Sequence, residues 1–367
     1  MTTESNGLNG WAAWFPGQGS QHVGMAKDLL DQFQTARLAF EEASDGAQLN
    51  LRKLCLDGPD SDLALTENTQ PCLLAASVAA YRVAAAEFGF RPHVAAGHSL
   101  GEYSALVCAG AFPLVRAAHW VRQRGAAMQR AVPQGQGTMA AVLGLDDAAV
   151  AAACKQATVE AELARKSSPD TADWDVPAWV EPANFNAPGQ VVVAGSTDGV
   201  AALVRLVKSG ATGGGKAMAL SVSAPFHSKL MRPARDAMAT LFAKAEPSDR
   251  PHALHFPYVP NRTARTTAEA GVVFELLIEQ VDHPVLWKQS VEHLLASGIT
   301  RAIEFGPGKV LQGLAKRIPF TNPQAPSSPE SGIENTPVVF SAIGVSDAAT
   351  LKLADLAWNA KKGTSSL

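Results

Sequence analysis

The pentapeptide GHSLG at residues 97–101 constrains the fold more than any other feature of the chain. It follows a short apolar run, 92–96, that predicts a buried strand, and it precedes a segment, 103–109, that predicts a helix. On such a turn the central serine is exposed, and glycines at both ends let neighbouring backbone pass closely. The start of the helix supplies N–H groups and partial positive charge beside the serine. The pattern predicts a nucleophilic Ser99, and a glycine-bounded turn with an ordinary serine is the simpler alternative.

The composition narrows the class of protein. The chain has 367 residues, of which 47% are apolar and 18% charged. This is enough apolar surface for two domains, or for one large domain with an insert. The net charge is −3 and no basic block is present, so no nucleic-acid partner is expected. The longest apolar stretch, 72–81, is shorter than the ~20 residues of a membrane span, so no membrane is expected either.

The cysteines and the N-terminal residues bear on the compartment. No two of the four cysteines, at 55, 72, 108 and 154, form a CxxC pair, and scattered thiols are typical of a reducing compartment. Residues 1–11 carry no Lys or Arg and do not resemble a signal peptide. No HExxH motif or dense ligand cluster predicts a metal. We therefore expect a cytoplasmic protein without a metal or other cofactor.

The order of the predicted elements indicates two structural units. Strands and helices alternate over 11–134, with strands at 11–15 and 92–96 and helices at 25–43 and 69–87, as in a parallel α/β core. Residues 135–213 follow the succession of a ferredoxin-like α+β subdomain, with two strands around Asn184.

We expect an α/β fold: a large α/β-hydrolase-like core with a parallel sheet, plus an inserted ferredoxin-like small subdomain. The second part of the core is then 214–317, and a strand at 216–222 returns the chain to it. The final segment, 318–367, is expected to hold a proline-rich loop over 319–337 and a helix.

A serine nucleophile needs a base. His227 follows a predicted strand and a proline-fixed turn, in SAPFHS at 223–228, and catalytic residues favour such strand ends. His98 adjoins Ser99 in sequence, but at a tight turn its side chain is expected to point elsewhere. A single histidine in a loop is often structural, so the sequence leaves both interpretations of His227 open.

Two further features suggest a site. The loop PGQGSQ at 16–21 follows the first strand, and its backbone can approach a ligand and supply an N–H to an oxyanion. A plain glycine turn is the alternative. Arg124 interrupts an apolar helix face that includes Trp120 and Met128. A guanidinium there is either the partner of a buried carboxylate or a cation that awaits an anionic substrate.

Together these stretches resemble the malonyl-CoA:acyl carrier protein transacylases and the acyltransferase domains of polyketide synthases. The resemblance runs from about Trp14 to Arg317. It rests on the following motifs: FPGQGSQ at 15–21, GHSLGEYSAL at 97–106, QRGAAMQRAVPQGQGTMAAVLG at 123–144, NFNAPGQVVVAG at 184–195, SAPFHSKLM at 223–231, PN at 260–261, EQVDHPVLW at 279–287 and EFGPGKVL at 304–311.

The resemblance implies roles for individual residues. Ser99 is the expected nucleophile and His227 its base, which a carbonyl of Gln280 orients. The N–H groups of Gln18 and Leu100 are expected to form the oxyanion hole. Four residues are expected to line the substrate pocket: Arg124 as the clamp on the malonyl carboxylate, Met128, Asn186 near the acyl thioester, and Phe226, which malonyl-preferring members carry.

The implied activity is transfer of a malonyl group from malonyl-CoA to the phosphopantetheine thiol of acyl carrier protein, for fatty-acid or polyketide synthesis, by a monomer. The cations Lys288, Lys309, Lys316 and Arg317 are candidates for docking the carrier, and a solvated face without a partner is the simpler alternative. One alternative is an esterase or thioesterase of the α/β-hydrolase type, in which Asp198 is the acid of a Ser–acid–His order. Another is a non-enzymatic module that binds acyl-CoA or carrier protein, which does not need Ser99, His227 and Arg124 together.

Overall fold

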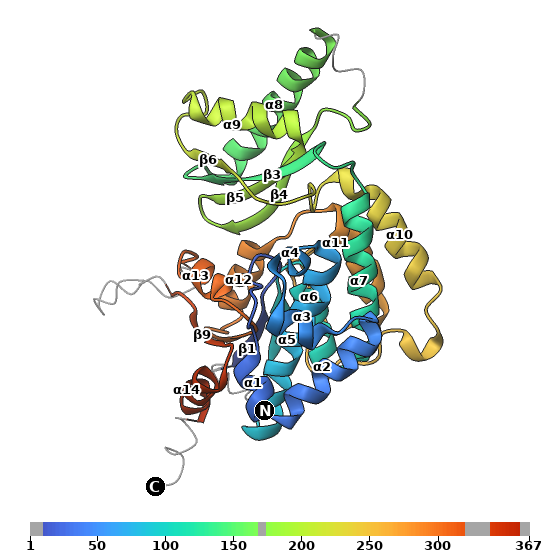
Figure 1. The fold of residues 1–367 in the computed structure, drawn as a ribbon. Helices are drawn as coiled ribbons and strands as arrows, with labels where there is room; N and C mark the ends of the chain where they lie inside the picture. The colour runs from blue at the N-terminus through green and yellow to red at the C-terminus, as the bar shows by residue number, and fades with distance from the viewer. Residues whose placement is uncertain (1–9, 168–173, 320–337, 360–367) are drawn as a thin grey trace, which may run out of the picture.

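The computed structural model describes residues 10–167, 174–319 and 338–359. Its larger unit is built on a five-stranded parallel sheet with strand order β7-β2-β1-β8-β9 (Figure 1). The strands are β1 (Trp11–Phe15), β2 (Val94–Gly97), β7 (Tyr258–Val259), β8 (Arg301–Phe305) and β9 (Ser341–Val345).

The apolar run of β1 is explained by burial on both faces of this sheet. Trp11, Ala13 and Phe15 belong to one hydrophobic core, whereas Ala12 and Trp14 belong to a second core on the other face. A strand that is covered on both sides has no need of polar alternation, which is why its sequence is continuously apolar.

Helices cover both faces of the parallel sheet (Figure 1). On one side α2, α5 and α7 pack against one another, and the Ala-rich α5 is buried along most of its length. The helices before β3 are α1 (Lys27–Gln32), α2 (Gln34–Ala47), α3 (Leu51–Asp57), α4 (Asp60–Leu63), α5 (Thr66–Glu87), α6 (Gly101–Cys108) and α7 (Leu114–Arg130). Those after β6 are α10 (Arg232–Ala243), α11 (Val273–Asp282), α12 (Trp287–Ala296), α13 (Val310–Ala315) and α14 (Ala348–Asn359).

The smaller unit is a four-stranded antiparallel sheet of order β4-β5-β3-β6, with helices α8 and α9 on the face turned away from the larger unit (Figure 1). Its elements are β3 (Gly137–Leu143), α8 (Asp147–Ser167), β4 (Val180–Ala187), β5 (Gln190–Ser196), α9 (Thr197–Lys208) and β6 (Lys216–Ala219). The predicted α/β fold with a parallel sheet and a second α+β unit is confirmed at this level.

The two units are joined at β4. The N–H of Phe185 donates to the carbonyl of Val285, and the N–H of Val285 donates to the carbonyl of Ala183, both at 2.9 Å. β4 therefore contacts the larger unit directly, through a segment that immediately precedes α12.

Three local predictions were wrong. The predicted helix 25–43 is two helices, because Phe33 is extended between α1 and α2. The two strands predicted around Asn184 turn instead at Pro188-Gly189, where Gly189 has a φ of +67°. The strand predicted to return the chain to the core is β6, which pairs antiparallel with β3 and so belongs to the smaller sheet.

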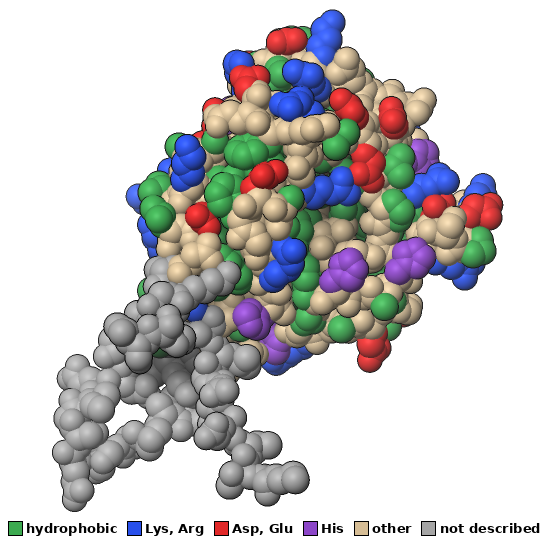
Figure 2. All heavy atoms as spheres, turned by 90° about the horizontal axis from the view of Figure 1, so that it is seen from below, with side chains coloured by type: hydrophobic (Ala, Val, Ile, Leu, Met, Phe, Trp, Pro, Cys, Tyr) green, Lys and Arg blue, Asp and Glu red, His purple; other side chains and the backbone are tan. Residues whose placement is uncertain are grey.

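Other expectations concern loops and the surface. The predicted loop 319–337 lies outside the described residues from 320 onward. Within the described ranges, no helix is long and apolar enough to cross a membrane. On the face seen from below, basic and acidic side chains are interspersed rather than gathered by sign (Figure 2).

Candidate active site

Ser99 lies on the tight turn between β2 and α6, in a left-handed conformation with φ of +52°. For a non-glycine residue this conformation costs about 1–2 kcal/mol. The flanking glycines are required by contact: a Cβ on Gly97 would lie 1.9 Å from the carbonyl carbon of Gly101, and one on Gly101 would lie 2.0 Å from the oxygen of Phe15. The turn is therefore pressed against the end of β1, and Ser99 stands above it.

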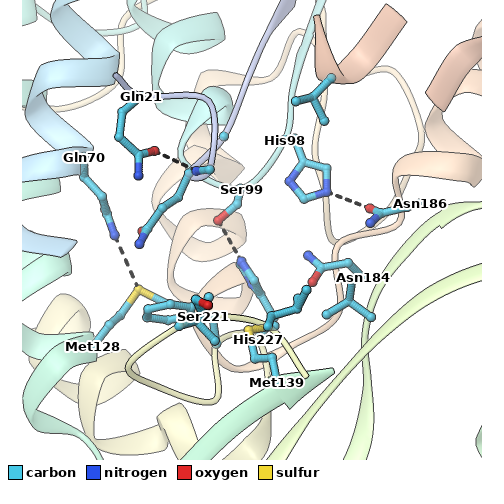
Figure 3. A pocket seen from close by; sticks show the side chains of 18 of the residues that line it. Gln21, Gln70, His98, Ser99, Met128, Met139, Asn184, Asn186, Ser221 and His227 are labelled. Atoms are coloured by element: carbon cyan, nitrogen blue, oxygen red, sulfur yellow. Dashed lines mark hydrogen bonds between the residues drawn. The ribbon is translucent and has the colours of Figure 1, made fainter. Parts of the chain in front are cut away.

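His227 faces this serine from the segment that follows β6. Its Nε2 lies 2.7 Å from Oγ of Ser99 (Figure 3), and its Nδ1 donates to the backbone carbonyl of Gln280 at 2.8 Å. Burial, and secondly the charge of Arg124, lower the pKa of His227 to about 3. The imidazole is therefore neutral near pH 7, and the bond to Gln280 leaves Nε2 unprotonated and directed at the serine.

Arg124 lies on α7, next to Ser99, with only 1% of its surface exposed. Its Nη1 donates to Oε1 of Gln70 at 2.8 Å, and its Nη2 donates to Oε1 of Gln280 at 2.8 Å and to Oγ of Ser99 at 3.2 Å. Burial lowers the pKa of Arg124. Among the described residues it forms no ion pair with a carboxylate, so of the two sequence hypotheses the buried salt bridge is not the one observed.

Two backbone N–H groups are expected, from the family resemblance, to face an oxygen atom beside Ser99. Those of Gln18 and Leu100 donate no hydrogen bond to any residue that the structure describes. The loop that carries Gln18 lies against the turn, because a Cβ on Gly17 would be 2.6 Å from the carbonyl oxygen of His98. Both donors are thus available to an oxygen atom beside Ser99.

These groups surround one cavity of about 300 Å³. Met128, Asn186 and Phe226 line it, as do Gln18, Ser99, Arg124 and His227; Leu100 and Gln280 lie buried behind it. His98 also lines the cavity but points away from the serine, with Nε2 at 2.9 Å from Oδ1 of Asn186 (Figure 3). The remaining lining residues are Gly17, Gly19, Gln21, Ala64, Gln70, Met139, Asn184, Val192, Leu220, Ser221, Val222, Val310, Leu311 and Leu314.

Comparisons with known proteins identify the family. The model of the acyl transferase domain matches residues 14–318. The malonyl CoA-acyl carrier protein transacylase of Escherichia coli (strain K12) is 43% identical over 304 residues, which are 83% of this chain and 91% of that protein. This chain belongs to the malonyl CoA-acyl carrier protein transacylase family. The resemblance seen in the sequence motifs is thereby confirmed, and the protein is an acyltransferase.

Solved structures of this acyltransferase family share the whole fold. The malonyl-CoA:acyl carrier protein transacylase from Xanthomonas oryzae pv. oryzae has a TM-score of 0.80 and 39% identity, over 95% of this chain and 98% of that one. A malonyl-transacylase in complex with its type II PKS acyl-carrier protein has a TM-score of 0.79 and 38% identity, over 94% of this chain and 98% of that one.

The structure of this acyltransferase adds three residues that sequence reasoning missed: Gln70, Glu102 and Asn261. Gln70 holds Arg124 and donates to Sδ of Met128 at 3.8 Å. Asn261, whose side chain is 1% exposed, donates to the carbonyl of Gly97 at 2.6 Å and accepts from the N–H of Ser99 at 2.7 Å. Asn261 stands in a motif that carried the family resemblance, whereas nothing in the sequence connects Gln70 with Arg124.

Glu102 is the third of these residues. It is fully buried, and burial raises its pKa to about 7. Its position three residues after Ser99 is visible in the sequence, but its partners come from two distant segments.

The acid proposed for the hydrolase alternative lies elsewhere in this acyltransferase. Asp198 is in the first turn of α9 and forms an ion pair with Arg165 at 2.6 Å. The N-cap of that helix is Ser196, not Asp198. His227 is bonded to a carbonyl instead of a carboxylate, so the Ser–acid–His arrangement is not formed. In the described ranges no group of three or more His, Cys, Asp or Glu side chains could hold a metal ion.

Proposed function

We propose that this acyltransferase moves a malonyl group from malonyl-CoA to the phosphopantetheine thiol of acyl carrier protein, through a malonyl ester of Ser99. The observation that carries the proposal is Arg124: a buried guanidinium, without a carboxylate partner among the described residues, lies 3.2 Å from Oγ of a serine that is paired with a neutral histidine. A buried cation of this kind favours an acyl group that brings its own carboxylate.

In the first half-reaction Ser99 attacks the thioester carbon of malonyl-CoA. His227 takes the hydroxyl proton through Nε2, and the carbonyl oxygen becomes an oxyanion that the N–H groups of Gln18 and Leu100 stabilise. When the tetrahedral intermediate collapses, the C–S bond breaks, and His227 returns the proton to the departing thiolate of coenzyme A. The bond from Nδ1 to Gln280 keeps the imidazole oriented throughout.

In the second half-reaction the phosphopantetheine thiol of the carrier attacks the ester. His227 accepts the thiol proton, the same two N–H groups hold the second oxyanion, and the proton passes to Oγ as the serine ester breaks. The partner of His227 is a neutral carbonyl, so no carboxylate raises the basicity of the imidazole. A thiol loses its proton far more readily than water does, so this half-reaction makes a smaller demand on the base than hydrolysis of the ester would.

Phe226 and Met128 make part of the cavity wall apolar, and Phe226 is 8% exposed. We assign Phe226 to selection against a methyl branch at the α-carbon of the acyl group, because a large ring leaves less room there. Oδ1 of Asn186 accepts a hydrogen bond from Nε2 of His98 at 2.9 Å, so its amide is fixed in place on the wall formed by β4.

Incubation with malonyl-CoA tests the proposal. We expect mass spectrometry to find one malonyl adduct on the peptide that contains Ser99, discharged on addition of holo carrier protein with formation of malonyl carrier. The Ser99→Ala variant should acquire no adduct, and His227→Ala should load at least ~10²-fold more slowly. An adduct that persists in Ser99→Ala overturns the nucleophile assignment, and release of free malonate in place of transfer favours a thioesterase.

The finer architectural assignments are part of the same proposal. The succession β3-α8-β4-β5-α9-β6 with sheet order β4-β5-β3-β6 supports a ferredoxin-like subdomain, inserted in an α/β-hydrolase-like core at 11–134 and 214–317, with 318–367 as a C-terminal segment. The pairing of β6 supports an extension of the insert to Ala219. We also propose a cytoplasmic monomer that needs no cofactor.

A further inference from the structure

The backbone of Ser99 is held on both sides by amide side chains. Its N–H donates to Oδ1 of Asn261 at 2.7 Å, and its carbonyl accepts from Nε2 of Gln280 at 2.9 Å. Asn261 follows β7 and Gln280 lies on α11, so two segments that are distant in sequence meet on one turn. A serine with positive φ persists only where its surroundings fix it, and these two bonds fix both of its peptide groups.

Both segments are bound to a single oxygen atom. Oε2 of Glu102 accepts from the N–H of Asn261 at 3.0 Å and from Nε2 of Gln280 at 2.8 Å. Glu102 lies in the first turn of α6, directly behind the nucleophile, and is 0% exposed. Its other oxygen, Oε1, has no hydrogen bond with any described residue, so the hydrogen bonds that this carboxyl makes are directed to the two residues that hold Ser99.

Gln280 extends the arrangement to the rest of the site. Its Oε1 accepts from Nη2 of Arg124 at 2.8 Å, and its backbone carbonyl accepts from Nδ1 of His227 at 2.8 Å. Gln280 therefore contacts Ser99, His227 and Arg124, and Glu102 holds the side-chain amide of Gln280 by a hydrogen bond.

We propose that Glu102 is a positioning residue for acyl transfer: without contact to substrate, its Oε2 anchors Asn261 and Gln280, which keep Oγ of Ser99 in line with His227. This inference rests on the proposed role of Ser99 as nucleophile. A buried carboxyl that served packing alone would be replaceable by an apolar side chain of similar volume, often with a gain in stability. The role proposed here requires an acceptor oxygen at that position, and no charge.

Three variants separate these alternatives. Glu102→Gln keeps an acceptor oxygen, Glu102→Ala removes it, and Glu102→Asp withdraws it by one methylene. Ser104→Ala is the matched control, because Ser104 lies on the same helix, is 1% exposed, and its hydroxyl makes no hydrogen bond with the described residues.

The rate of single-turnover loading is measured per active site, with malonyl-CoA and with acetyl-CoA, and compared with the labelling of Ser99 by phenylmethanesulfonyl fluoride. We expect Glu102→Ala and Glu102→Asp to load at least ~10-fold more slowly, since small displacements of a nucleophile have effects of this size. Both thioesters should slow by the same factor, with KM nearly unchanged. Glu102→Gln should stay within about threefold of wild type, and Ser104→Ala should equal it.

Several outcomes would overturn the inference. One is wild-type loading per folded site in Glu102→Ala, with loss of stability alone; where that variant does not fold, wild-type loading in Glu102→Asp decides. Another is an equal loss of loading rate in Glu102→Gln and Glu102→Ala, which would mean that the negative charge of Glu102 is required and not merely an acceptor oxygen. Failure of the proposed function is seen separately: wild-type protein would then react with the sulfonyl fluoride at Ser99 but not with malonyl-CoA.

Discussion

We propose that Arg124 is the residue at which this acyltransferase distinguishes its substrates. Malonyl-CoA differs from acetyl-CoA by a carboxylate, which a guanidinium binds through charge-assisted hydrogen bonds worth about 1.5–3 kcal/mol. An acetyl group would leave the buried guanidinium of Arg124 without an anion in contact with it. The neutral acceptors Gln70 and Gln280 hold the guanidinium in the absence of substrate, so it is already in place when the carboxylate arrives.

We therefore expect a malonyl-over-acetyl preference of at least ~10²-fold in kcat/KM, and most of it should be lost in Arg124→Ala. Arg124→Lys should restore little, because an ammonium makes no planar two-point contact. The measurement is kcat/KM for malonyl-, acetyl- and butyryl-CoA in the three proteins. An equal decrease for all three thioesters in Arg124→Ala would make the arginine structural.

The pKa of His227 gives a second prediction at this scale. A base acts only when neutral, and burial together with Arg124 holds this pKa at about 3 instead of the usual 6.5. The loading rate should therefore show no loss as the pH falls through 6.5, and should decline only well below pH 5. In Arg124→Ala the decline should move to higher pH, because the charge of Arg124 is the largest cause of the lowered pKa after burial.

This profile is best measured with acetyl-CoA in the Glu102→Gln background. The malonyl carboxylate of malonyl-CoA would itself titrate in the acid range. Glu102 would also titrate within the profile, because burial raises its pKa to about 7. An acid limb with a midpoint near 6.5 in the wild-type arginine background would contradict the interpretation of His227 as a desolvated base.

At the scale of elements, the sequence predicted β1, β2, α5, α6 and α7 because each has a simple cause. Continuous apolar runs indicate strands buried on both faces, and long Ala-rich segments without breakers indicate buried helices. The turn at Pro188-Gly189 was missed although proline and glycine are typical turn residues, because β4 is irregular, with register shifts at 182/184 and 185/187. The pairing partner of β6 was not predictable from its four residues, since pairing is set by the tertiary fold.

The same limit explains which parts of the site could be predicted. Ser99 and His227 stand in strand-to-helix and strand-end positions that carry chemistry in many folds, so pattern alone makes them candidates, although for His227 it leaves a structural role open. Gln280, Gln18 and Leu100 required the family resemblance. Gln70 acts through contacts of α5 with α7, and Glu102 and Asn261 act through contacts between α6, α11 and the segment after β7. No spacing in the sequence reveals these contacts.

The turn between β2 and α6 gives a prediction at this scale. In Gly97→Ala the new methyl group would lie 1.9–2.5 Å from backbone atoms of Gly101 and Glu102. Backbone cannot move aside as a flexible side chain does, so we expect a loss of about 3 kcal/mol or more in unfolding free energy, or failure to fold. Chemical denaturation followed by circular dichroism measures it.

The control for this substitution is Gly271→Ala. Gly271 lies in the short helical turn Ala270–Val272, and a Cβ there would meet nothing within 4 Å. We expect its unfolding free energy to change by less than about 1 kcal/mol. Similar losses in the two variants would mean that close packing of the turn is not what requires the glycine.

At the scale of the whole molecule, the site lies where the two units meet. The larger unit provides Ser99, Arg124 and His227, whereas the strands of the smaller sheet provide Met139, Asn186 and other parts of the wall. The backbone bonds of β4 to Val285 tie this wall to the larger unit. Neither unit alone contains a complete pocket. Both units are therefore needed to enclose the acyl group, although that group is small.

Docking of a carrier protein depends on local charge, because the molecule as a whole is slightly acidic. Helix α13 contributes Leu311 and Leu314 to the cavity, and the exposed Lys309 and Lys316 stand at its two ends. Arg317 is also exposed and donates to Oε1 of Gln190 at 2.6 Å. Lys288 is a weaker candidate, because it is half-buried and ion-paired with Asp147.

If carriers of this pathway are acidic, as the family resemblance implies, cations beside the cavity should steer them. Reversal of two charges, Lys309→Glu with Lys316→Glu, should raise the apparent KM for carrier protein about threefold to tenfold and leave the KM for malonyl-CoA unchanged. It should also flatten the dependence of kcat/KM on ionic strength, since attraction between exposed charges is screened by salt.

The matched control is Lys53→Glu with Lys244→Glu, which changes the net charge by the same amount. Lys53 is exposed on α3 and Lys244 is exposed just after α10, and neither helix contributes a residue to the cavity. Equal effects of the two double variants would assign the change to overall charge, and an equal rise in both KM values would assign it to the cavity itself; either result would remove α13 as a docking surface.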